Sequence, residues 1–215
     1  MLKTFRIDNV DLTMNITHST DETQLYWAAN RLNDLPMLKV MQRVKKKGAI
    51  IDIGASWGNH TVFFGKIMER KVYAFEPKKN KFETLKKNAI SNEIDAKIYN
   101  YAISDYNGYA HKSDGEIQYI KKTSDVLTIK TNILNNFIFE SICFIRINVE
   151  NHYKQILSGS KRILNESQPD LFIKVNKREI NNVLELLNND FKLKYEYVEH
   201  LELGYIHELK HFKAI

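Results

Sequence analysis

The chain has 215 residues, and its 32 lysines and arginines against 26 aspartates and glutamates give a net charge of +6. A hydrophobic fraction of 43% excludes a disordered chain and is enough for one domain with a full core. No apolar run reaches the roughly 20 residues that span a bilayer, no secretory signal opens the chain, and the single cysteine, Cys143, cannot form an internal disulfide, so we expect a cytoplasmic protein.

The basic residues are spread along the chain in short groups instead of being gathered in one segment. These groups are Arg43 with 45–47, 78–79, 86–87 and 121–122. Proteins that bind nucleic acid usually concentrate positive charge on one face, with aromatic side chains between the basic ones. The charge pattern therefore does not favour a nucleic-acid partner.

The first 47 residues contain Trp27, Leu32, Leu35 and Leu38, which indicates a small helical N-terminal cap. From residue 48 to 215, short β-rich runs alternate with helical runs, the pattern of a mostly parallel sheet with helices on both faces. The predicted strands are 49–54, 71–77, 96–103, 142–149, 171–175, 192–199 and 204–209, with a hairpin after Gly108 that runs through Tyr119. The predicted helices are 58–69, 79–88, one that begins near 153, and 180–187. We therefore predict a doubly wound α/β domain over 48–215 behind a cap over 1–47.

Two of the predicted strands end in residues that suit a ligand. In an open α/β sheet, ligands bind outside the carboxyl ends of the strands. The first strand ends in a loop from Asp52 to Asn59, in which Gly54 permits a close approach of ligand to backbone. A dinucleotide site needs glycine at 54, 56 and 59, but Ser56 and Asn59 occupy the last two places. The nicotinamide interpretation is therefore not favoured.

The second strand ends at Glu76, 18 residues after Gly58 in the sequence Phe75-Glu76-Pro77. A carboxylate at this place can accept hydrogen bonds from the 2′- and 3′-hydroxyls of a ribose. A glutamate that is only solvated is the alternative for the residue taken alone. Its position after a strand, a glycine loop and a helix favours the ribose role.

From Gly48 to Val175 the chain resembles the FkbM-like family of S-adenosylmethionine-dependent methyltransferases. The segments that carry the resemblance are 51–61, 72–77, 85–88, 101–105 with Gly108, 146–150 and 156–159. The resemblance implies a Rossmann-like class I methyltransferase with a seven-stranded sheet, S-adenosylmethionine as its cofactor, and methyl transfer to a hydroxyl oxygen. Acceptors in the family include sugars, glycolipid or polysaccharide units and natural-product scaffolds.

The resemblance also implies which residues hold the cofactor. The residues expected beside its methionine part are Asp52, Gly54, Ala55 and Gly58, with Ser56 and Asn59 in the same loop. Glu76 would hold the ribose. The segment Asn100-Tyr101-Ala102 would lie near the adenine.

Three positions depart from the family's acidic pattern, at Lys130, Asn148 and Lys174. One interpretation is an acceptor pocket adapted to an anionic substrate, such as a phosphorylated or acidic sugar, with Lys174 or Arg146 as the counter-charge. The other interpretation is a protein that binds cofactor without efficient catalysis, or an interaction protein built on a methyltransferase scaffold. We favour the first, because the cofactor motifs are intact.

O-methylation needs a base to remove the proton of the acceptor hydroxyl. The catalytic candidates follow the fourth strand: Asn148, Glu150 and His152. Each also has a plain structural role available, since a lone histidine often only packs and Glu150 could cap the next helix. Of the three, His152 is the one we would test first as the base.

Other methyltransferase classes fit the sequence less well. The fourth strand is followed by no Asn/Asp-Pro-Pro turn, which enzymes acting on exocyclic amines of nucleic acids are expected to have. Cys143 lies early in an apolar run, too far from the strand end for a thiol nucleophile. The histidines are isolated, so we expect no metal site. The sequence leaves the oligomeric state open.

Overall fold

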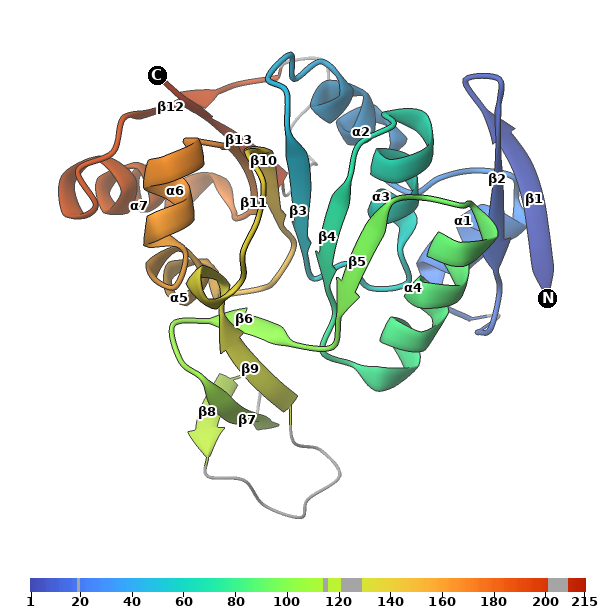
Figure 1. The fold of residues 1–215 in the computed structure, drawn as a ribbon, viewed down its shortest axis with the longest axis horizontal. Coiled ribbons are helices and arrows are strands. Elements are labelled where there is room, and N and C mark those ends of the chain that lie inside the picture. The colour runs from blue at the N-terminus through green and yellow to red at the C-terminus, as the bar shows by residue number, and fades with distance from the viewer. Residues whose placement is uncertain (19, 114–115, 121–128, 201–208) are drawn as a thin grey trace.

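A seven-stranded sheet forms the centre of the protein, in a computed structural model that describes residues 1–18, 20–113, 116–120, 129–200 and 209–215 (Figure 1). In spatial order its strands are β12 (Tyr195–Val198), β13 (Leu209–Ala214), β11 (Asp170–Lys174), β10 (Ile142–Ile147), β3 (Ala49–Ile53), β4 (Val72–Phe75) and β5 (Ala96–Tyr99). The pairs from β11 to β5 are all parallel, and β13 pairs antiparallel with both of its neighbours. The doubly wound α/β prediction is confirmed.

The central strands have no alternation of polar and apolar residues. Every residue of β3, β4 and β10 is buried. This is expected of parallel strands, because helices cover both faces of such a sheet. Short runs such as Ala49-Ile50-Ile51 therefore predicted these strands without any period-2 pattern.

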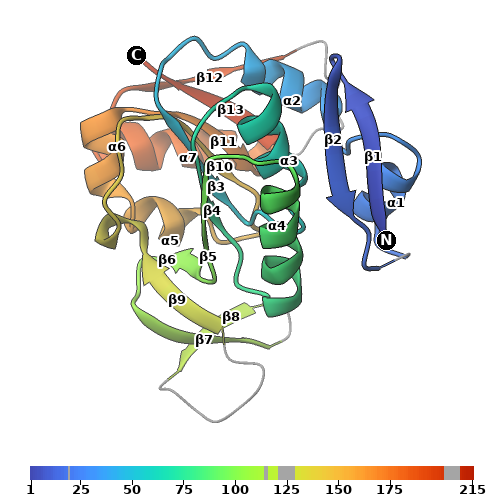
Figure 2. The same cartoon turned by 45° about the vertical axis from the view of Figure 1, so that its right-hand side comes forward.

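Helices pack on both faces of the sheet (Figures 1 and 2). One face carries α5 (Tyr153–Ser158), α6 (Lys161–Ser167) and α7 (Ile180–Leu184), whose apolar side chains form one core with Ile51, Ile53 and Ile145. The other face carries α1 (Glu22–Ala28), α2 (Leu35–Gln42), α3 (Asn59–Val62) and α4 (Lys79–Ser91), which form a second core with Ile50 and Phe144. Among the described residues, no helix has the length and apolar character needed to cross a bilayer.

Two predicted helices are found with a change of helical type. The helix expected over 58–69 consists of α3 and a π-helical segment, Phe63–Ile67. The helix expected over 180–187 is α7 followed by a second π-helical segment, Glu185–Asp190. Short 3₁₀ helices occur at Leu134–Asn136 and Lys177–Glu179.

The N-terminal segment is not entirely helical, because a β-hairpin precedes α1 and α2. Strands β1 (Leu2–Ile7) and β2 (Val10–Asn15) pair antiparallel around Asp8 and Asn9, which have φ of 50° and 63°. A two-residue loop with positive φ at both positions matches the right-handed twist of a hairpin. Figure 2 shows the hairpin beside α1 and α4, and its inward side chains Phe5, Leu12 and Met14 are buried in the second core.

A second sheet extends from the carboxyl ends of the central strands, at the bottom of Figure 1. It consists of β6 (Ala102–Ser104), β9 (Ile129–Ile133), β7 (Gly108–Ser113) and β8 (Glu116–Ile120), and β7 with β8 forms the predicted hairpin. The strand expected over 96–103 is therefore wrong as one element, because Asn100 and Tyr101 leave the central sheet and β6 pairs with β9 instead. The strand expected over 204–209 lies outside the described residues except for Leu209, where β13 begins.

A buried ion pair joins the two central strands. Arg146 of β10 and Asp52 of β3 are register partners, and Arg146 Nη1 lies 2.5 Å from Asp52 Oδ1. Both side chains are almost fully buried, and Thr61 of α3 donates a further hydrogen bond of 2.6 Å to Asp52 Oδ2. A buried ion pair adds little net stability over a well-packed apolar pair, but removing one partner leaves an unpaired buried charge.

We expect Arg146→Met to lower the free energy of unfolding by about 3–5 kcal/mol, since it leaves the Asp52 carboxylate unpaired. The double variant with Asp52→Leu should be less destabilised than Arg146→Met alone. Urea unfolding followed by circular dichroism measures both. A double variant that is as unstable as Arg146→Met, or that loses the sum of the two single effects, would contradict the coupling that the geometry predicts.

Candidate functional site

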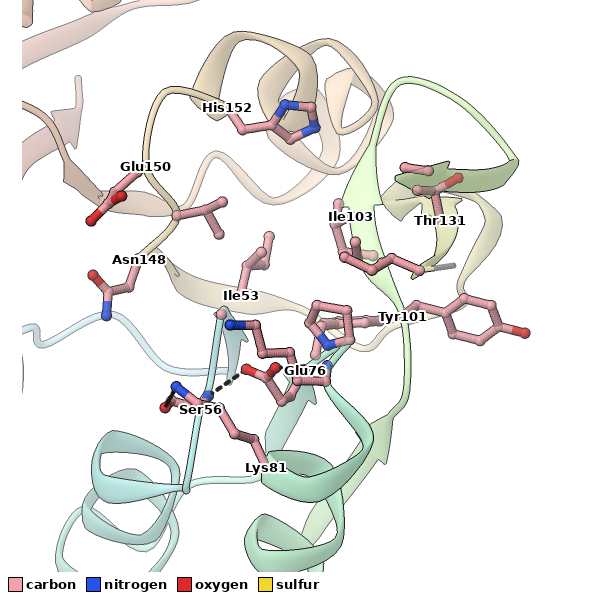
Figure 3. A pocket seen from close by; sticks show the side chains of 18 of the residues that line it. Ile53, Ser56, Glu76, Lys81, Tyr101, Ile103, Thr131, Asn148, Glu150 and His152 are labelled. Carbon is pink, nitrogen blue, oxygen red and sulfur yellow. Dashed lines mark hydrogen bonds between the residues drawn. The ribbon is translucent and has the colours of Figure 1, made fainter. Parts of the chain in front are cut away.

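A cavity of about 470 Å³ opens where β3, β4 and β10 end (Figure 3). Strand order reverses at this place, because the chain continues from β3 outward through β4 and β5 and then returns to β10 on the other side of β3. Such a switch point leaves a crevice between the loops of two neighbouring strands. The cavity is therefore where the sequence placed the site.

The loop after β3 forms the floor of the cavity. Gly54 has φ of 77°, and a Cβ at this residue would lie 2.6 Å from the backbone oxygen of Asn148. No other residue fits without moving the loop that follows β10. Ser56, also with positive φ at 55°, continues the turn.

Glu76 connects this loop to the end of β4. Its Oε2 accepts a hydrogen bond of 2.8 Å from the Ser56 amide, the dashed line in Figure 3, and its Oε1 accepts one of 2.8 Å from the Lys78 amide. The side chain is 5% exposed and lines the cavity. Burial raises the pKa of Glu76, while the two amide bonds and the nearby Lys81 and Lys78 lower it in part. Each carboxylate oxygen keeps a lone pair for a ligand.

Five of the ten residues predicted to bind the cofactor line the cavity: Gly54, Ser56, Glu76, Tyr101 and Ala102. The other five do not line it: Asp52, Ala55, Gly58, Asn59 and Asn100. Their contact with the cofactor stays a prediction. Asp52 is paired with Arg146, and Asn100 Nδ2 donates 2.9 Å hydrogen bonds to the backbone oxygens of Glu76 and Pro77.

Gly58 and Asn59 fix the loop between β3 and α3 (residues 54–58, called the cofactor loop below) to its surroundings. Gly58 has φ of 96°, and a Cβ there would lie 2.7 Å from Leu85 of α4. Asn59 Oδ1 accepts a hydrogen bond from the indole of Trp27, and Asn59 Nδ2 donates to the backbone oxygen of Asn33, so one buried amide joins the loop to the N-terminal segment.

A second buried amide makes the same connection from α4. Asn88 Nδ2 donates a 2.7 Å hydrogen bond to the backbone oxygen of Trp57 in the cofactor loop. Its Oδ1 accepts from the backbone and side chain of Asn15 at the end of β2. Asn92, the residue directly after α4, bonds to the backbone of Thr13 and to the backbone oxygen of Asn88.

The three predicted catalytic residues all line the cavity, in the loop between β10 and α5. Glu150 is exposed, and its Oε1 lies 3.2 Å from Nζ of Lys174, another lining residue. Glu150 does not cap α5, whose N-cap is His152 without a side-chain capping bond. Asn148 is held through its backbone amide, which donates to the oxygen of Ile53.

His152 is 6% exposed, and its Nε2 lies 3.0 Å from the hydroxyl of Ser104 in β6. Ser104 in turn donates a 3.2 Å hydrogen bond to the Asp105 carboxylate, so a chain of polar contacts runs from the imidazole to Asp105. Burial lowers the pKa of His152, while Asp105 raises it in part. The imidazole is therefore neutral near pH 7 and able to take up a proton.

Among the lining residues that sequence reasoning missed are Lys81 and Thr131. Lys81 donates a 2.9 Å hydrogen bond to the Ser56 hydroxyl and lies over the Trp57 ring. A lysine in the first turn of the helix after Glu76 was the available signal. Thr131 reaches the cavity through the pairing of β6 with β9, which nothing in the sequence specified.

Two other expectations concern a thiol and a metal. Cys143 is buried in β10, and burial raises its pKa to about 11, so the thiol is not a nucleophile near neutral pH. Within the described part of the chain, no group of three or more His, Cys, Asp or Glu side chains is arranged to hold a metal ion.

The family model described as a methyltransferase FkbM domain matches residues 52–205. Among solved structures, a methyltransferase FkbM from Methylobacillus flagellatus KT has a TM-score of 0.53 at 15% identity, over 77% of this chain and 43% of that one. An rRNA methylase from Streptococcus thermophilus has a TM-score of 0.51 at 16% identity, over 84% of this chain and 95% of that one. M. jannaschii TYW2, solved in complex with AdoMet, has a TM-score of 0.57 at 11% identity, over 100% of this chain and 87% of that one. No curated protein matches the chain.

At these identities the structural likeness shows a shared fold. This chain spans less than half the length of the Methylobacillus protein. The matched family segment begins at Asp52, so the N-terminal hairpin, which is bonded to Asn88 of α4, lies outside it.

We expect Asn88→Leu and Asn92→Leu to destabilise the protein similarly, by about 1–3 kcal/mol, because each leaves hairpin backbone or side-chain groups unpaired. Only Asn88→Leu also frees the Trp57 carbonyl of the cofactor loop. It should weaken binding of S-adenosylhomocysteine about fivefold or more by calorimetric titration, with Asn92→Leu near wild type. Equal affinities in the two variants would show that the loop does not depend on this bond.

Proposed function

The chain belongs to the FkbM family of methyltransferases, and from this premise we propose that it methylates a hydroxyl oxygen of a carbohydrate-like or natural-product-like acceptor that carries an anionic group. The observation that carries the proposal is a neutral, buried histidine, His152, on the same cavity as the Glu76 carboxylate. The first supplies a base for a hydroxyl and the second an anchor for the cofactor.

The residues of the cavity fit S-adenosylmethionine, which supplies an electrophilic methyl group on a sulfonium sulfur. Glu76, held by two backbone amides, is suited to accept hydrogen bonds from the ribose hydroxyls. The Gly54 turn leaves bare backbone at the floor, where the methionine part would lie. Tyr101 and Ala102 line the end of the cavity expected for the adenine.

His152 is proposed as the general base. Ser104 and Asp105 hold its ring through Nε2, so Nδ1 is the nitrogen that takes the proton of the acceptor hydroxyl. The positive charge that forms on the ring is partly balanced by Asp105. A base that is neutral at the working pH and fixed by a second residue is the arrangement that acid–base catalysis needs.

Asn148 and Glu150 are proposed to orient the acceptor. The amide of Asn148 can donate to and accept from a sugar hydroxyl without adding charge. The carboxylate of Glu150 is paired with Lys174 at 3.2 Å, which holds it on the side of the cavity toward β11.

An anionic acceptor group would meet Lys174, which lines the cavity and is less exposed than its partner Glu150. Arg146, the other counter-charge considered from the sequence, is committed to Asp52 and does not line the cavity. Of these two counter-charges, Lys174 is the one that lines the cavity, where an anionic acceptor would compete with Glu150 for it.

We expect Glu76→Gln to weaken binding of S-adenosylhomocysteine about ten- to a hundredfold, because hydrogen bonds to a charged acceptor are worth about 1.5–3 kcal/mol. Titration calorimetry measures the loss. Glu83→Gln, which removes an exposed carboxylate of α4, is the matched control and should bind like wild type. A folded wild-type protein that does not bind would sink the proposal.

Once an acceptor has been found by screening, His152→Gln should lower kcat about 10²- to 10⁴-fold and leave the cofactor affinity unchanged.

In wild type, the rate should fall as the pH drops through the pKa of His152, which burial lowers from its ordinary value, because protonation removes the base. This acid limb should vanish in His152→Gln and persist in Glu150→Gln. The reverse pattern would make Glu150 the base.

A further inference from the structure

The protein has a second cavity, of about 440 Å³, at the other end of β11 from the cavity described above. Asp170, the first residue of β11, lines the second cavity, whereas Lys174, the last residue of that strand, lines the first. The two cavities share no described lining residue. In Figure 1, α2 and the C-terminus lie at the top, on the side of the second cavity, and the second sheet lies at the bottom. A volume of this size suits a small ligand, and the cofactor and acceptor of the proposed function do not account for it.

Positive charge dominates the lining of the second cavity. The charged and imidazole side chains that the described part of the chain contributes to it are Arg43, Lys45, Lys46, Lys213, His200, His211 and one carboxylate, Asp170. Three of these cations come from the basic group at 43–47, which takes no part in the first cavity. A hollow lined mainly by one sign of charge concentrates ions of the opposite sign. The lining therefore favours an anion.

The carboxylate of Asp170 is engaged by partners within the protein. Its Oδ2 lies 3.2 Å from Nε2 of His211, and its Oδ1 accepts a 3.4 Å hydrogen bond from the Ala214 amide. His211 is 8% exposed, and its ring stacks on Phe172 with 4.4 Å between centroids. Its Nδ1 lies 3.1 Å from Nε2 of His200. A fixed, buried imidazole thus faces the acid of this lining, which limits how far that acid balances the cations.

Two of the cations also have a structural role. Lys46 donates hydrogen bonds of 2.6 and 2.7 Å to backbone oxygens at the end of α6. Arg43 is the C-cap residue of α2, where the helix dipole favours positive charge. Lys45 and Lys213 are not explained in this way, since Lys213 lies 3.8 Å from Glu196 in an exposed pair of little energy. These two lysines are therefore the cations best placed to serve a ligand.

Apolar side chains lie beside the cations in the same lining. Val40 of α2 is 3% exposed, and Val44 and Ala214 line the cavity with it. An inorganic anion needs only the cations, whereas apolar lining suits a ligand with a carbon framework. Lysine is a common partner of phosphate, whose oxygens accept charge-assisted hydrogen bonds. The combination suits an organic phosphate.

We propose that the second cavity binds a small organic phosphate, with its phosphate at Lys45 and Lys213 and its carbon framework against Val40, Val44 and Ala214. The pairing of Asp170 with His211 limits the repulsion between the Asp170 carboxylate and the phosphate. This ligand is separate from the cofactor and the acceptor of the proposed function, because the two cavities lie at opposite ends of β11.

Phenyl phosphate, which joins a phosphate to one apolar ring, is the probe for titration calorimetry. We expect wild type to bind it with a dissociation constant below about 1 mM, and to bind inorganic phosphate several times more weakly. Lys45→Met combined with Lys213→Met should weaken phenyl phosphate about tenfold or more, because methionine keeps the apolar stem and removes the charge. A folded wild type that does not bind, or that binds inorganic phosphate equally well, would overturn the proposal.

Lys86→Met combined with Lys87→Met is the matched control. It removes two exposed cations of α4 that do not line the cavity, and it lowers the net charge by the same amount. This variant should bind phenyl phosphate like wild type. Equal losses in the two double variants would mean that net charge alone is responsible, and would overturn the site.

Two further titrations show which cavity holds the probe. Lys174→Met removes the cation of the first cavity and should leave the affinity for phenyl phosphate unchanged. Saturating S-adenosylhomocysteine should not displace the probe. Loss of binding in Lys174→Met, or displacement by S-adenosylhomocysteine, would place phenyl phosphate in the first cavity and overturn this inference while leaving the proposed function untouched.

His211→Phe tests the part given to the buried imidazole. Phenylalanine keeps a ring on Phe172 but leaves the Asp170 carboxylate without its imidazole partner, so we expect phenyl phosphate to bind about threefold more weakly or worse. Adding Asp170→Asn removes the repelling charge and should restore the affinity. A double variant that binds no better than His211→Phe would contradict this electrostatic role.

Discussion

The buried pair of Asp52 and Arg146 is the interaction around which the site is arranged. It joins β3 to β10 one step before both strands end, at the place where strand order reverses. The loops after these strands, with Gly54 and Asn148, are then held so close that a Cβ on Gly54 would meet the Asn148 carbonyl. Two charges taken out of water are stable only in good mutual geometry, so the pair fixes the relative position of the strands more than it adds to stability.

Support for the cofactor loop comes from outside the family's matched segment. Buried amides of Asn59 and Asn88 connect it to Trp27, Asn33 and Asn15, all in the first 47 residues. A side-chain amide is well suited to this, because it can satisfy a donor and an acceptor on two different segments at once. The N-terminal segment and the central sheet also share one apolar core. The packing is therefore continuous across residue 47, where the sequence predicted a boundary between the cap and the domain.

The cavity has two chemically different ends. Toward β10 and β11 its lining is polar, with Asn148, Glu150 and Lys174, and toward the second sheet it is apolar apart from Thr131. An acceptor hydroxyl needs the first environment and a purine ring the second. His152 lies between the loop after β10 and the second sheet, since it belongs to the former and bonds to Ser104 in the latter. The proposed base is thus held by both halves of the cavity.

The sequence by itself determined the strand–loop–helix unit at Gly54, the carboxylate at Glu76 and the residues after the fourth strand, because the geometry of each is set by neighbours in the chain. The hairpin around Asp8 and Asn9 had a local signal too, two small polar residues between β-rich runs, which the apolar residues further along obscured. Only the tertiary structure decided that Asp52 pairs with Arg146, that Asn59 bonds to Trp27 and Asn33, and that Thr131 reaches the cavity. These depend on which strands pair and which face a side chain takes, and contacts between residues tens of positions apart leave no periodic pattern in a single sequence.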